Sequence, residues 1–211
     1  MSDNTIPQGG SRIRELIEAA ERLIDQHRHT PLTMAQIATE AGLPESVARE
    51  IVPDEKAMID VLADMAITHL LDSISRRTVA IDTGDALERL RAIAEGFMEW
   101  AMQRPHEFLL AADRNLVTIS NSAALKRLND SVLDLLHRSI KEAQTQGRLN
   151  PTADLDTMAV TGRALVYGLA RMSIDGHFEE WAVNPESDPQ EIARKSFDLY
   201  LDAMSQKAGT Q

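Results

Sequence analysis

Arg49 and Lys56 are the side chains in this sequence whose type and setting best suit contact with a polyanion. They lie in the stretch GLPESVAREIVPDEKAM, residues 42–58, which has the rhythm of a short helix that follows a tight turn. A helix in that position commonly enters the major groove of DNA, where arginine reads guanine and basic side chains contact phosphates. The same stretch also carries four acidic side chains, so its net charge opposes this chemistry.

A second group of residues in the later part of the chain has the types found in small-molecule pockets. Methionine and aromatic side chains line pockets that accept varied apolar ligands, and interleaved histidine or arginine can orient a carboxylate or carbonyl. Taken one by one, the apolar members also fit ordinary core packing and the polar members fit surface ion pairs. The predicted ligand-binding residues are Phe97, Trp100, Met102, His106, Phe108, Arg114, Arg163, Tyr167 and Met172.

The sequence offers little for metal binding or catalysis. His27 and His29 form a His-x-His pair, but no third ligand is nearby in the sequence. The glycine-rich phosphate loop, the nucleophile elbow and the metalloprotease helix signature are all missing from the sequence. The many paired carboxylates indicate solvated helix faces. We therefore expect no metal site, no cofactor and no enzymatic activity.

Composition sets the broad class of protein. The chain has 211 residues, of which 43% are hydrophobic, and no cysteine. That is enough apolar material for a normal core, and the absence of cysteine fits a reducing compartment. The N-terminus lacks a signal segment, and no apolar run is long enough for a membrane span. We expect a soluble, cytoplasmic protein without a membrane partner. The net charge of −11 disfavours nucleic acid for the average surface but leaves room for a local contact.

Helical periodicity runs through the chain, and no alternating strand pattern or repeat is present. The sequence therefore predicts an all-α fold of about nine helices, in which a three-helix head precedes a larger helical body. We divide it into a disordered arm at residues 1–10, a helix-turn-helix head at 11–58 and a ligand-binding and dimerisation body at 59–207. The expected helices cover residues 11–26, 33–41, 45–51, 54–77, 85–104, a segment from 105, 120–146, 154–174 and 188–204.

Local signals fix several helix ends. Thr33 and Gln36 have the spacing of a capping box, in which each side chain binds a backbone amide of the first turn. Gly42 stands where a helix ends and positive φ is tolerated. Pro53 stops the short helix, and Asp188 followed by Pro189 can open the last one. We expect a small core for the head from Ile13, Leu16, Ala20, Leu23, Ile37, Ala38, Ala41, Val47 and Ile51.

These features resemble TetR-type transcriptional regulators. Residues 16–58, LIEAAERLIDQHRHTPLTMAQIATEAGLPESVAREIVPDEKAM, are similar to the family's N-terminal domain. The run RALVYGLARMSIDGH, residues 163–177, is similar to the eighth helix of a subgroup with an apolar-aromatic-Gly signature. The positions that fall in register without a gap are Ile37, Ala38, Ala41, Gly42, Pro53 and Ala57.

The resemblance implies a function and a set of DNA contacts. It predicts a ligand-responsive regulator, most commonly a repressor, that binds operator DNA as a homodimer and is released by a small apolar or amphipathic effector. Two recognition helices in a two-fold dimer would reach successive major grooves. The positions that the resemblance places at DNA are Thr33, Met34, Glu45, Ser46, Arg49 and Lys56.

The head departs from the family pattern in its charge. The family commonly has Lys at position 45, Tyr at 49, an aromatic at 52 and Lys at 55, whereas this chain has Glu45, Arg49, Val52 and Glu55. Residues 1–60 contain six Arg and Lys against eleven Asp and Glu, a net charge of −5. Since each phosphate contact contributes roughly 0.9 to the salt slope of binding, weak DNA binding is expected. The alternative is a small-molecule or protein-binding module on a TetR-like fold that has lost DNA binding.

The last long helices suggest a dimer interface. Apolar residues recur at spacings of three and four between residues 155 and 172, and Gly162 would permit close approach of another helix. Two such helices from each chain can form a four-helix interface, although packing within one chain gives the same pattern. The predicted interface residues are Leu155, Met158, Gly162, Leu165, Leu169, Phe197, Leu201 and Met204.

Overall fold

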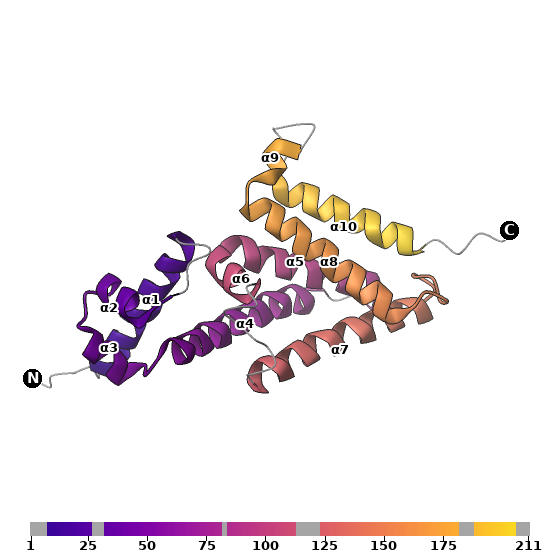
Figure 1. Ribbon diagram of the computed structural model, residues 1–211. Helices are drawn as coiled ribbons and strands as arrows, with labels where there is room; N and C mark the ends of the chain where they lie inside the picture. The colour runs from indigo at the N-terminus through magenta and orange to yellow at the C-terminus, as the bar shows by residue number, and fades with distance from the viewer. Residues whose placement is uncertain (1–7, 27–31, 82–83, 113–122, 182–187, 206–211) are drawn as a thin grey trace, which may run out of the picture. The chain divides into compact units, whose positions relative to one another are not determined.

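The computed structural model describes residues 8–26, 32–81, 84–112, 123–181 and 188–205. These residues form ten α-helices and no strand, which confirms the predicted all-α class (Figure 1). The short helix α9 lies where the sequence led us to expect a loop. The helices are α1 (Gln8–Gln26), α2 (Met34–Glu40), α3 (Glu45–Ile51), α4 (Glu55–Val79), α5 (Ala86–Gln103), α6 (Pro105–Ala112), α7 (Ala123–Thr145), α8 (Leu155–Ile174), α9 (His177–Trp181) and α10 (Pro189–Ser205).

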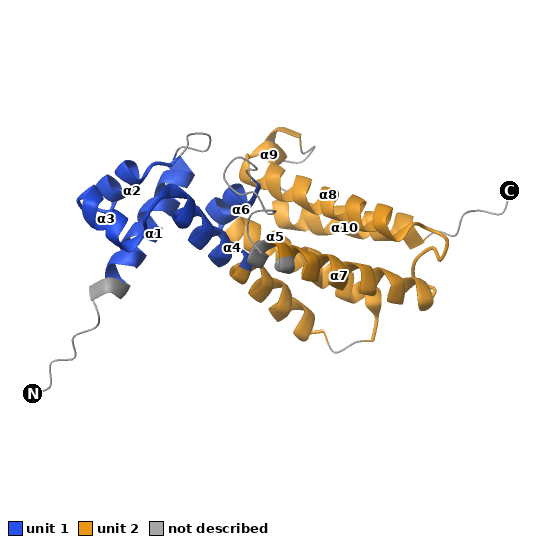
Figure 2. Ribbon diagram, turned by 60° about the horizontal axis from the view of Figure 1, so that its bottom comes forward, with its two compact units in different colours: residues 1–67, 104–125 blue, residues 68–103, 126–211 orange. Residues whose placement is uncertain are grey.

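The helices pack into two compact units (Figure 2). Unit 1 comprises residues 1–67 and 104–125, and unit 2 comprises residues 68–103 and 126–211. The chain passes from unit 1 to unit 2 within α4, and α6 returns to unit 1 to pack against α1. The division of roles at residue 58 stays a prediction, because these units are defined by packing alone.

The first helix begins earlier than the sequence suggested. Residues 8–10, which we expected in the arm, form the first turn of α1. Ser11 lies inside the helix, and its hydroxyl donates to Glu15 Oε1 at 3.0 Å instead of capping the N-terminus. The polar composition of this stretch favoured a loop, but helical geometry extends through it. Residues 1–7 lie outside the described residues.

The core of unit 1 forms where α1 contacts α2, α3 and α6. Leu16, Ala20, Ile37 and Ala38 are buried there, as predicted. In α3 the buried residue is Ala48, because a small side chain lets this short helix approach its neighbours closely. The remaining residues of the predicted core are only partly buried: Ile13, Leu23, Ala41, Val47 and Ile51.

The helix-turn-helix motif has the local geometry that its sequence predicts. The Thr33 hydroxyl accepts from the Gln36 amide at 3.3 Å, and Gln36 Oε1 accepts from the Thr33 amide at 3.0 Å. This reciprocal pair confirms the capping box at the start of α2. Gly42 has φ of +69°, so it makes the turn that a residue with a side chain rarely adopts.

Unit 2 is built around α8, which contacts α5, α9 and α10. Its larger apolar cluster joins residues of α5, α7, α8 and α10 with Leu149, which lies between α7 and α8. At Gly96, α5 comes so near to α4 that an added Cβ would lie 2.7 Å from Ile74 Cα. The cluster comprises Ala86, Leu87, Leu90, Ile140, Ala143, Leu149, Met158, Ala159 and Leu201.

The contact between α8 and α10 explains the small residue at position 162. A Cβ added to Gly162 would lie 3.3 Å from the ring of Tyr200, so the glycine makes room for this aromatic side chain. The Tyr200 hydroxyl donates to the Met158 carbonyl oxygen at 2.6 Å. Close approach at Gly162, which we expected from a second chain, therefore occurs within one chain.

No helix in the part of the chain that the structure describes combines the length and the apolar character that crossing a membrane requires.

Candidate functional site

The exposed face of α3 carries the residues predicted to contact DNA. Glu45, Ser46, Arg49 and Glu50 are all exposed and share one side of the helix, while Ala48 faces the core. Pro44 precedes α3 and provides no side-chain cap. Glu45 therefore places a carboxylate in the first turn of α3, where the amides of a recognition helix would otherwise meet a phosphate.

Arg49 is at the surface but is held by its own helix and its neighbours. Its side chain is 40% exposed. The guanidinium donates from Nε to Glu45 at 2.8 Å, from Nη1 to the Pro53 carbonyl at 3.2 Å and from Nη2 to Glu55 at 3.3 Å. All three partners are within unit 1, so residues of the head already satisfy much of the hydrogen-bonding capacity of this guanidinium.

Glu55 links this arginine to the helix-turn-helix scaffold. Its Oε1 accepts a hydrogen bond from the Met34 amide at 2.9 Å, at the start of α2. That backbone bond and the charge of Arg49 lower the pKa of the Glu55 carboxyl. The sequence showed a lysine replaced by an acid here but gave no hint that the acid caps α2, because the two positions are 21 residues apart.

The remaining predicted DNA contacts differ in how accessible they are. Thr33 is exposed, although its hydroxyl serves the capping box. The Met34 side chain is fully buried, so it belongs to the core of unit 1 and cannot reach a ligand. Lys56 is exposed and donates to Asp60 at 2.5 Å. Arg22 is paired with Glu40 at 2.7 Å, so internal carboxylates engage this basic residue of the head as well.

The predicted ligand-binding residues that the structure describes are divided between unit 1 and unit 2. Trp100 is buried and meets the Phe97 ring edge-on, with ring centroids 5.6 Å apart. Met172 packs against the small cluster of Leu169, Phe178 and Ala193. Tyr167 and Arg163 are exposed on α8, and Arg163 donates to Asn129 at 3.3 Å.

The other ligand candidates lie in or near unit 1. Phe108 is buried there, and His106 faces Glu21 of α1 at 3.5 Å. Arg114 lies outside the described residues, as do His27 and His29. Helical periodicity in the sequence predicted that these residues lie on helices, but it did not show which residues belong to unit 1 and which to unit 2.

A groove of about 500 Å³ lies within unit 2 between the end of α4 and helices α5, α8 and α10. Of the predicted ligand residues, Met102 lines it, together with Leu169 and Phe197 from the predicted dimer set. Its charged wall was not predicted from the sequence. On α5, Arg91, Glu95, Met98, Glu99 and Met102 recur at spacings of three and four, a pattern that indicates one face of a helix.

The groove wall is held by ion pairs. Arg91 Nε donates to Asp198 at 2.6 Å and Arg91 Nη1 donates to Glu88 at 2.6 Å. On another side, Arg77 Nε lies 2.7 Å from Glu99. The groove thus combines an apolar floor with charged groups of both signs, which suits an amphipathic small molecule.

The predicted dimer residues face the core of their own unit. Met158 and Leu201 are buried in the larger cluster, and Leu155, Phe197 and Met204 pack against it. Leu169 and Leu165 belong to the smaller cluster. A spacing of three and four identifies one apolar face, and in this chain that face meets its own helices. Among the described residues, the large exposed apolar side chains of α8 and α10 are Val160, Tyr167 and Leu199.

Comparison with known proteins assigns the class. Residues 90–204 match the family model described as "Tetracyclin repressor-like, C-terminal domain". The curated HTH-type transcriptional regulator BetI of Yersinia pestis (strain Pestoides F) is 29% identical over 85 residues, which cover 40% of this chain and 43% of BetI. The aligned stretch thus spans less than half of that relative. The chain belongs to the TetR family of transcriptional regulators.

Solved structures show the same fold. The TetR family regulator PfmR of Thermus thermophilus superposes with a TM-score of 0.70 at 15% identity, covering 92% of this chain and 99% of PfmR. The ketosteroid transcriptional regulator KstR2 of Mycobacterium tuberculosis gives a TM-score of 0.68 at 16% identity, covering 93% of this chain and 96% of KstR2. These similarities confirm the helix-turn-helix fold that the sequence predicted, and the relatives named here are described as transcriptional regulators.

Proposed function

We propose that this chain is a ligand-responsive transcriptional regulator that binds operator DNA as a homodimer and is released by an amphipathic effector. The observation that carries this proposal is the exposed face of α3, where Ser46 and Arg49 stand on a correctly capped helix-turn-helix motif. Family membership makes a repressor the expected mode of action. We do not include Met34 among the proposed DNA contacts, because its side chain is buried.

DNA binding by this head requires an exchange of partners at Arg49. The guanidinium must leave Glu45 before it can reach a base edge, while the Glu45 carboxylate repels the backbone phosphates. Lys56 must likewise turn from Asp60 to contact phosphate. We therefore propose specific but weak binding with a shallow salt dependence, carried by a few local contacts.

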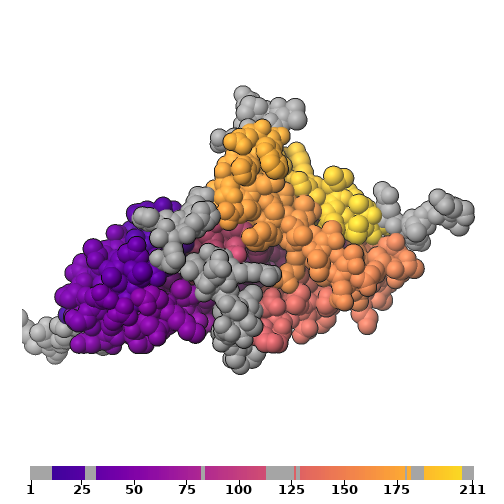
Figure 3. All heavy atoms as spheres, viewed as in Figure 1, coloured from indigo at the N-terminus to yellow at the C-terminus, as the bar shows by residue number. Residues whose placement is uncertain are grey.

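The outer face of α8 and α10 is the proposed dimer surface. These helices lie side by side at the surface of unit 2 (Figure 3). Val160 is 65% exposed, Tyr167 42% and Leu199 71%. Val160 and Tyr167 are seven positions apart on α8, so they share one face of that helix. Burial of these side chains against a second copy would form a four-helix interface, as expected for this architecture.

The effector is proposed to bind in the groove of unit 2. Met98, Met102, Leu169 and Phe197 offer an adaptable apolar floor, while Arg91 can turn towards an anionic or carbonyl group. KstR2 is named for ketosteroids, a class of bulky and largely apolar molecules. We propose an effector with a similar balance of a large apolar body and a few polar groups.

A second candidate function is a small-molecule or protein-binding module without DNA binding. It is favoured by the engagement of Arg22, Arg49 and Lys56 with carboxylates of the head itself. Selection of bound DNA from a random pool at low salt distinguishes the two. Enrichment of one palindromic sequence, lost in R49A, supports the regulator. A pool without enrichment at low salt supports the alternative.

A further inference from the structure

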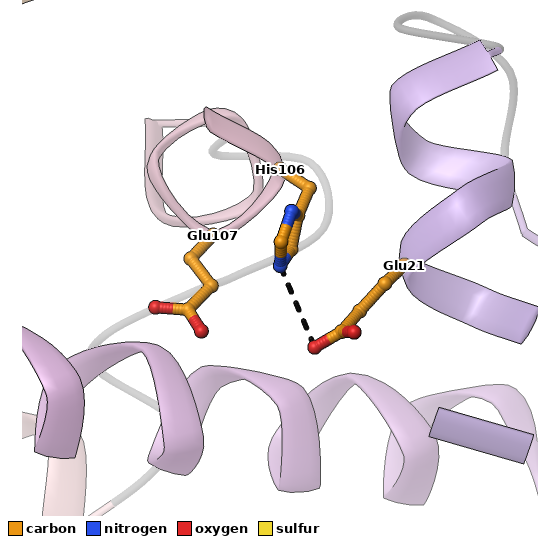
Figure 4. Close-up of side chains that lie close together, drawn as sticks. All are labelled: Glu21, His106 and Glu107. Atoms are coloured by element: carbon orange, nitrogen blue, oxygen red, sulfur yellow. Dashed lines mark ion pairs between the residues drawn. The ribbon is translucent and has the colours of Figure 1, made fainter. Parts of the chain in front are cut away.

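In unit 1, α6 packs against α1 and brings three metal-ligating side chains together. His106 and Glu107 extend from the first turn of α6, and Glu21 extends from α1 towards the same space (Figure 4). One ligand atom from each residue lies within 4.8 Å of the others. Because Glu21 is far from the other two in the sequence, this grouping is a product of the fold.

The distances between the ligand atoms are close to those of an occupied metal site. His106 Nε2 lies 3.5 Å from Glu21 Oε1. Zinc binds imidazole nitrogen and carboxylate oxygen at about 2.0–2.2 Å, so two ligand atoms of a tetrahedral site stand roughly 3.3–3.6 Å apart. The pair of His106 and Glu21 already has this separation, and rotation of the Glu107 carboxylate would bring in the third ligand.

The imidazole of His106 is placed as a ligand would be. Its Nε2 atom is buried and makes no hydrogen bond, which is costly for a polar atom unless it has another partner. On the other side of the ring, Nδ1 lies 3.8 Å from the carboxylate of Asp25. A carboxylate on that side of the ring can hydrogen-bond to an Nδ1 proton once the two groups move a few tenths of an ångström closer, and that would direct the Nε2 lone pair to a metal.

The charges around this cluster favour a cation. Glu21, Asp25 and Glu107 contribute three carboxylates, and Glu107 is only 3% exposed. The guanidinium of Arg104 contacts Glu107 at 3.1 Å and supplies one positive charge. Among these four charged groups the carboxylates outnumber the guanidinium, which favours a cation between them.

We propose that Glu21, His106 and Glu107 bind a divalent transition-metal ion, with Zn²⁺ the best match to one imidazole and two carboxylates. A solvent molecule would complete four-coordination. Asp25 is a positioning residue that orients the imidazole. The bound ion would tie α6 to α1, and this proposal stands whether or not the head binds DNA.

The test is metal titration of the full-length chain after treatment with a chelator. We expect Zn²⁺ to bind with a stoichiometry of about one per chain in calorimetry and to raise the melting temperature, because the ion binds the folded state. Co²⁺ should give the visible absorption bands of a four-coordinate site. H106Q and E21Q should each weaken Zn²⁺ binding by at least about tenfold, and D25N by about tenfold because the imidazole loses the carboxylate that orients it.

Control variants separate this site from surface histidines. H137Q removes a histidine that faces Asp156 at 3.2 Å on the surface, and the double variant H27Q/H29Q removes the His-x-His pair. Both should bind Zn²⁺ like the wild type. Circular dichroism shows whether each variant folds, and E21Q is the safer substitution because it is isosteric. Absence of Zn²⁺ binding by the wild type, unchanged binding in folded E21Q, or its loss in H27Q/H29Q would each overturn the proposal.

Discussion

Arg49 Nε lies 2.8 Å from the carboxylate of Glu45, one helical turn earlier on the exposed face of α3. The side chain proposed to read DNA is therefore bound to a residue that also repels DNA. Composition alone gives only the net negative charge of the head. The structure shows that Glu45 would compete with DNA for the Arg49 guanidinium.

Replacing Glu45 should strengthen DNA binding. E45Q removes a carboxylate from the N-terminus of α3 and weakens its hold on Arg49, so affinity for the selected DNA should rise several-fold. The salt slope should also steepen, by up to roughly 0.9 for each additional phosphate that the variant neutralises. Fluorescence anisotropy over a salt series measures both quantities.

The matched control is E50Q, which makes the same charge change at another exposed position of α3. If E50Q raises the affinity as much as E45Q does, general electrostatics accounts for the effect and the pairing with Arg49 plays no special part. R49A should abolish sequence preference in either background.

Glu55 should stabilise the head in a pH-dependent way. The Met34 amide and Arg49 hold its pKa below the ordinary value of 4.5, so the folded state favours the carboxylate. Its stabilisation is complete above that value and is lost as pH falls through the folded pKa. E55Q should therefore be less stable than the wild type at about pH 7, and the difference between the two should shrink at an acid pH below the ordinary pKa of 4.5.

Urea unfolding followed by circular dichroism at both pH values checks this expectation. E50Q serves again as the control, because Glu50 lies on the solvent-facing side of α3. A difference between E55Q and the wild type that persists unchanged in acid would show that the carboxylate charge is not responsible.

Gly96 should be intolerant of even a methyl group. A Cβ there would lie 2.7 Å from Ile74 Cα and 3.0 Å from the Ser73 carbonyl oxygen, so α4 and α5 would have to separate. G96A should destabilise unit 2 by about 1–3 kcal/mol, the usual cost of overpacking. At Gly168, where a Cβ meets open space, G168A should instead stabilise α8 by up to about 1 kcal/mol. Thermal unfolding of both variants tests the contrast.

The dimer surface makes a prediction about oligomeric state. V160D and L199D place a carboxylate on the exposed faces of α8 and α10, so each should weaken self-association by at least about tenfold. V79D is the control, because Val79 is 81% exposed at the end of α4. Light scattering coupled to gel filtration gives the mass. A wild-type chain that runs as a monomer at every concentration tested would refute the homodimer.

The groove of unit 2 should bind an amphipathic dye. Anilinonaphthalene sulfonate combines fused and single aromatic rings with an anionic group, which suits the methionine floor and Arg91. M102W fills part of the groove and should reduce the dye's fluorescence enhancement, whereas V79W should not. Equal enhancement in the wild type and M102W would place the dye elsewhere.

The sequence predicted the head better than the body, and the reason is physical. Thr33, Gln36 and Gly42 act through backbone hydrogen bonds and φ angles over a few residues, so their spacing alone predicts the motif. The all-α class follows from periodicity in the same way. The boundary at the start of α1 was misplaced, because polar composition does not by itself exclude helix.

Long-range partners could not be predicted. Periodicity showed that Met158 and Leu165 share a face of α8, but not that this face packs against the chain's own α5 and α10. The pairing of Arg91 with Asp198, which builds the groove wall, joins residues 107 positions apart. The approach of His106 to Glu21 likewise depends on α6 returning to α1, which no local pattern encodes.

Glu55 has a consequence for how such a head can change over time. Its carboxylate oxygen Oε1 accepts hydrogen bonds both from the Met34 amide at the start of α2 and from Arg49. Arg49 could therefore turn towards DNA while the hydrogen bond between Glu55 and the Met34 amide is kept. If the head binds DNA as proposed, substitutions at residues 45 and 49 would change its affinity for DNA while leaving the Glu55–Met34 hydrogen bond of the motif in place.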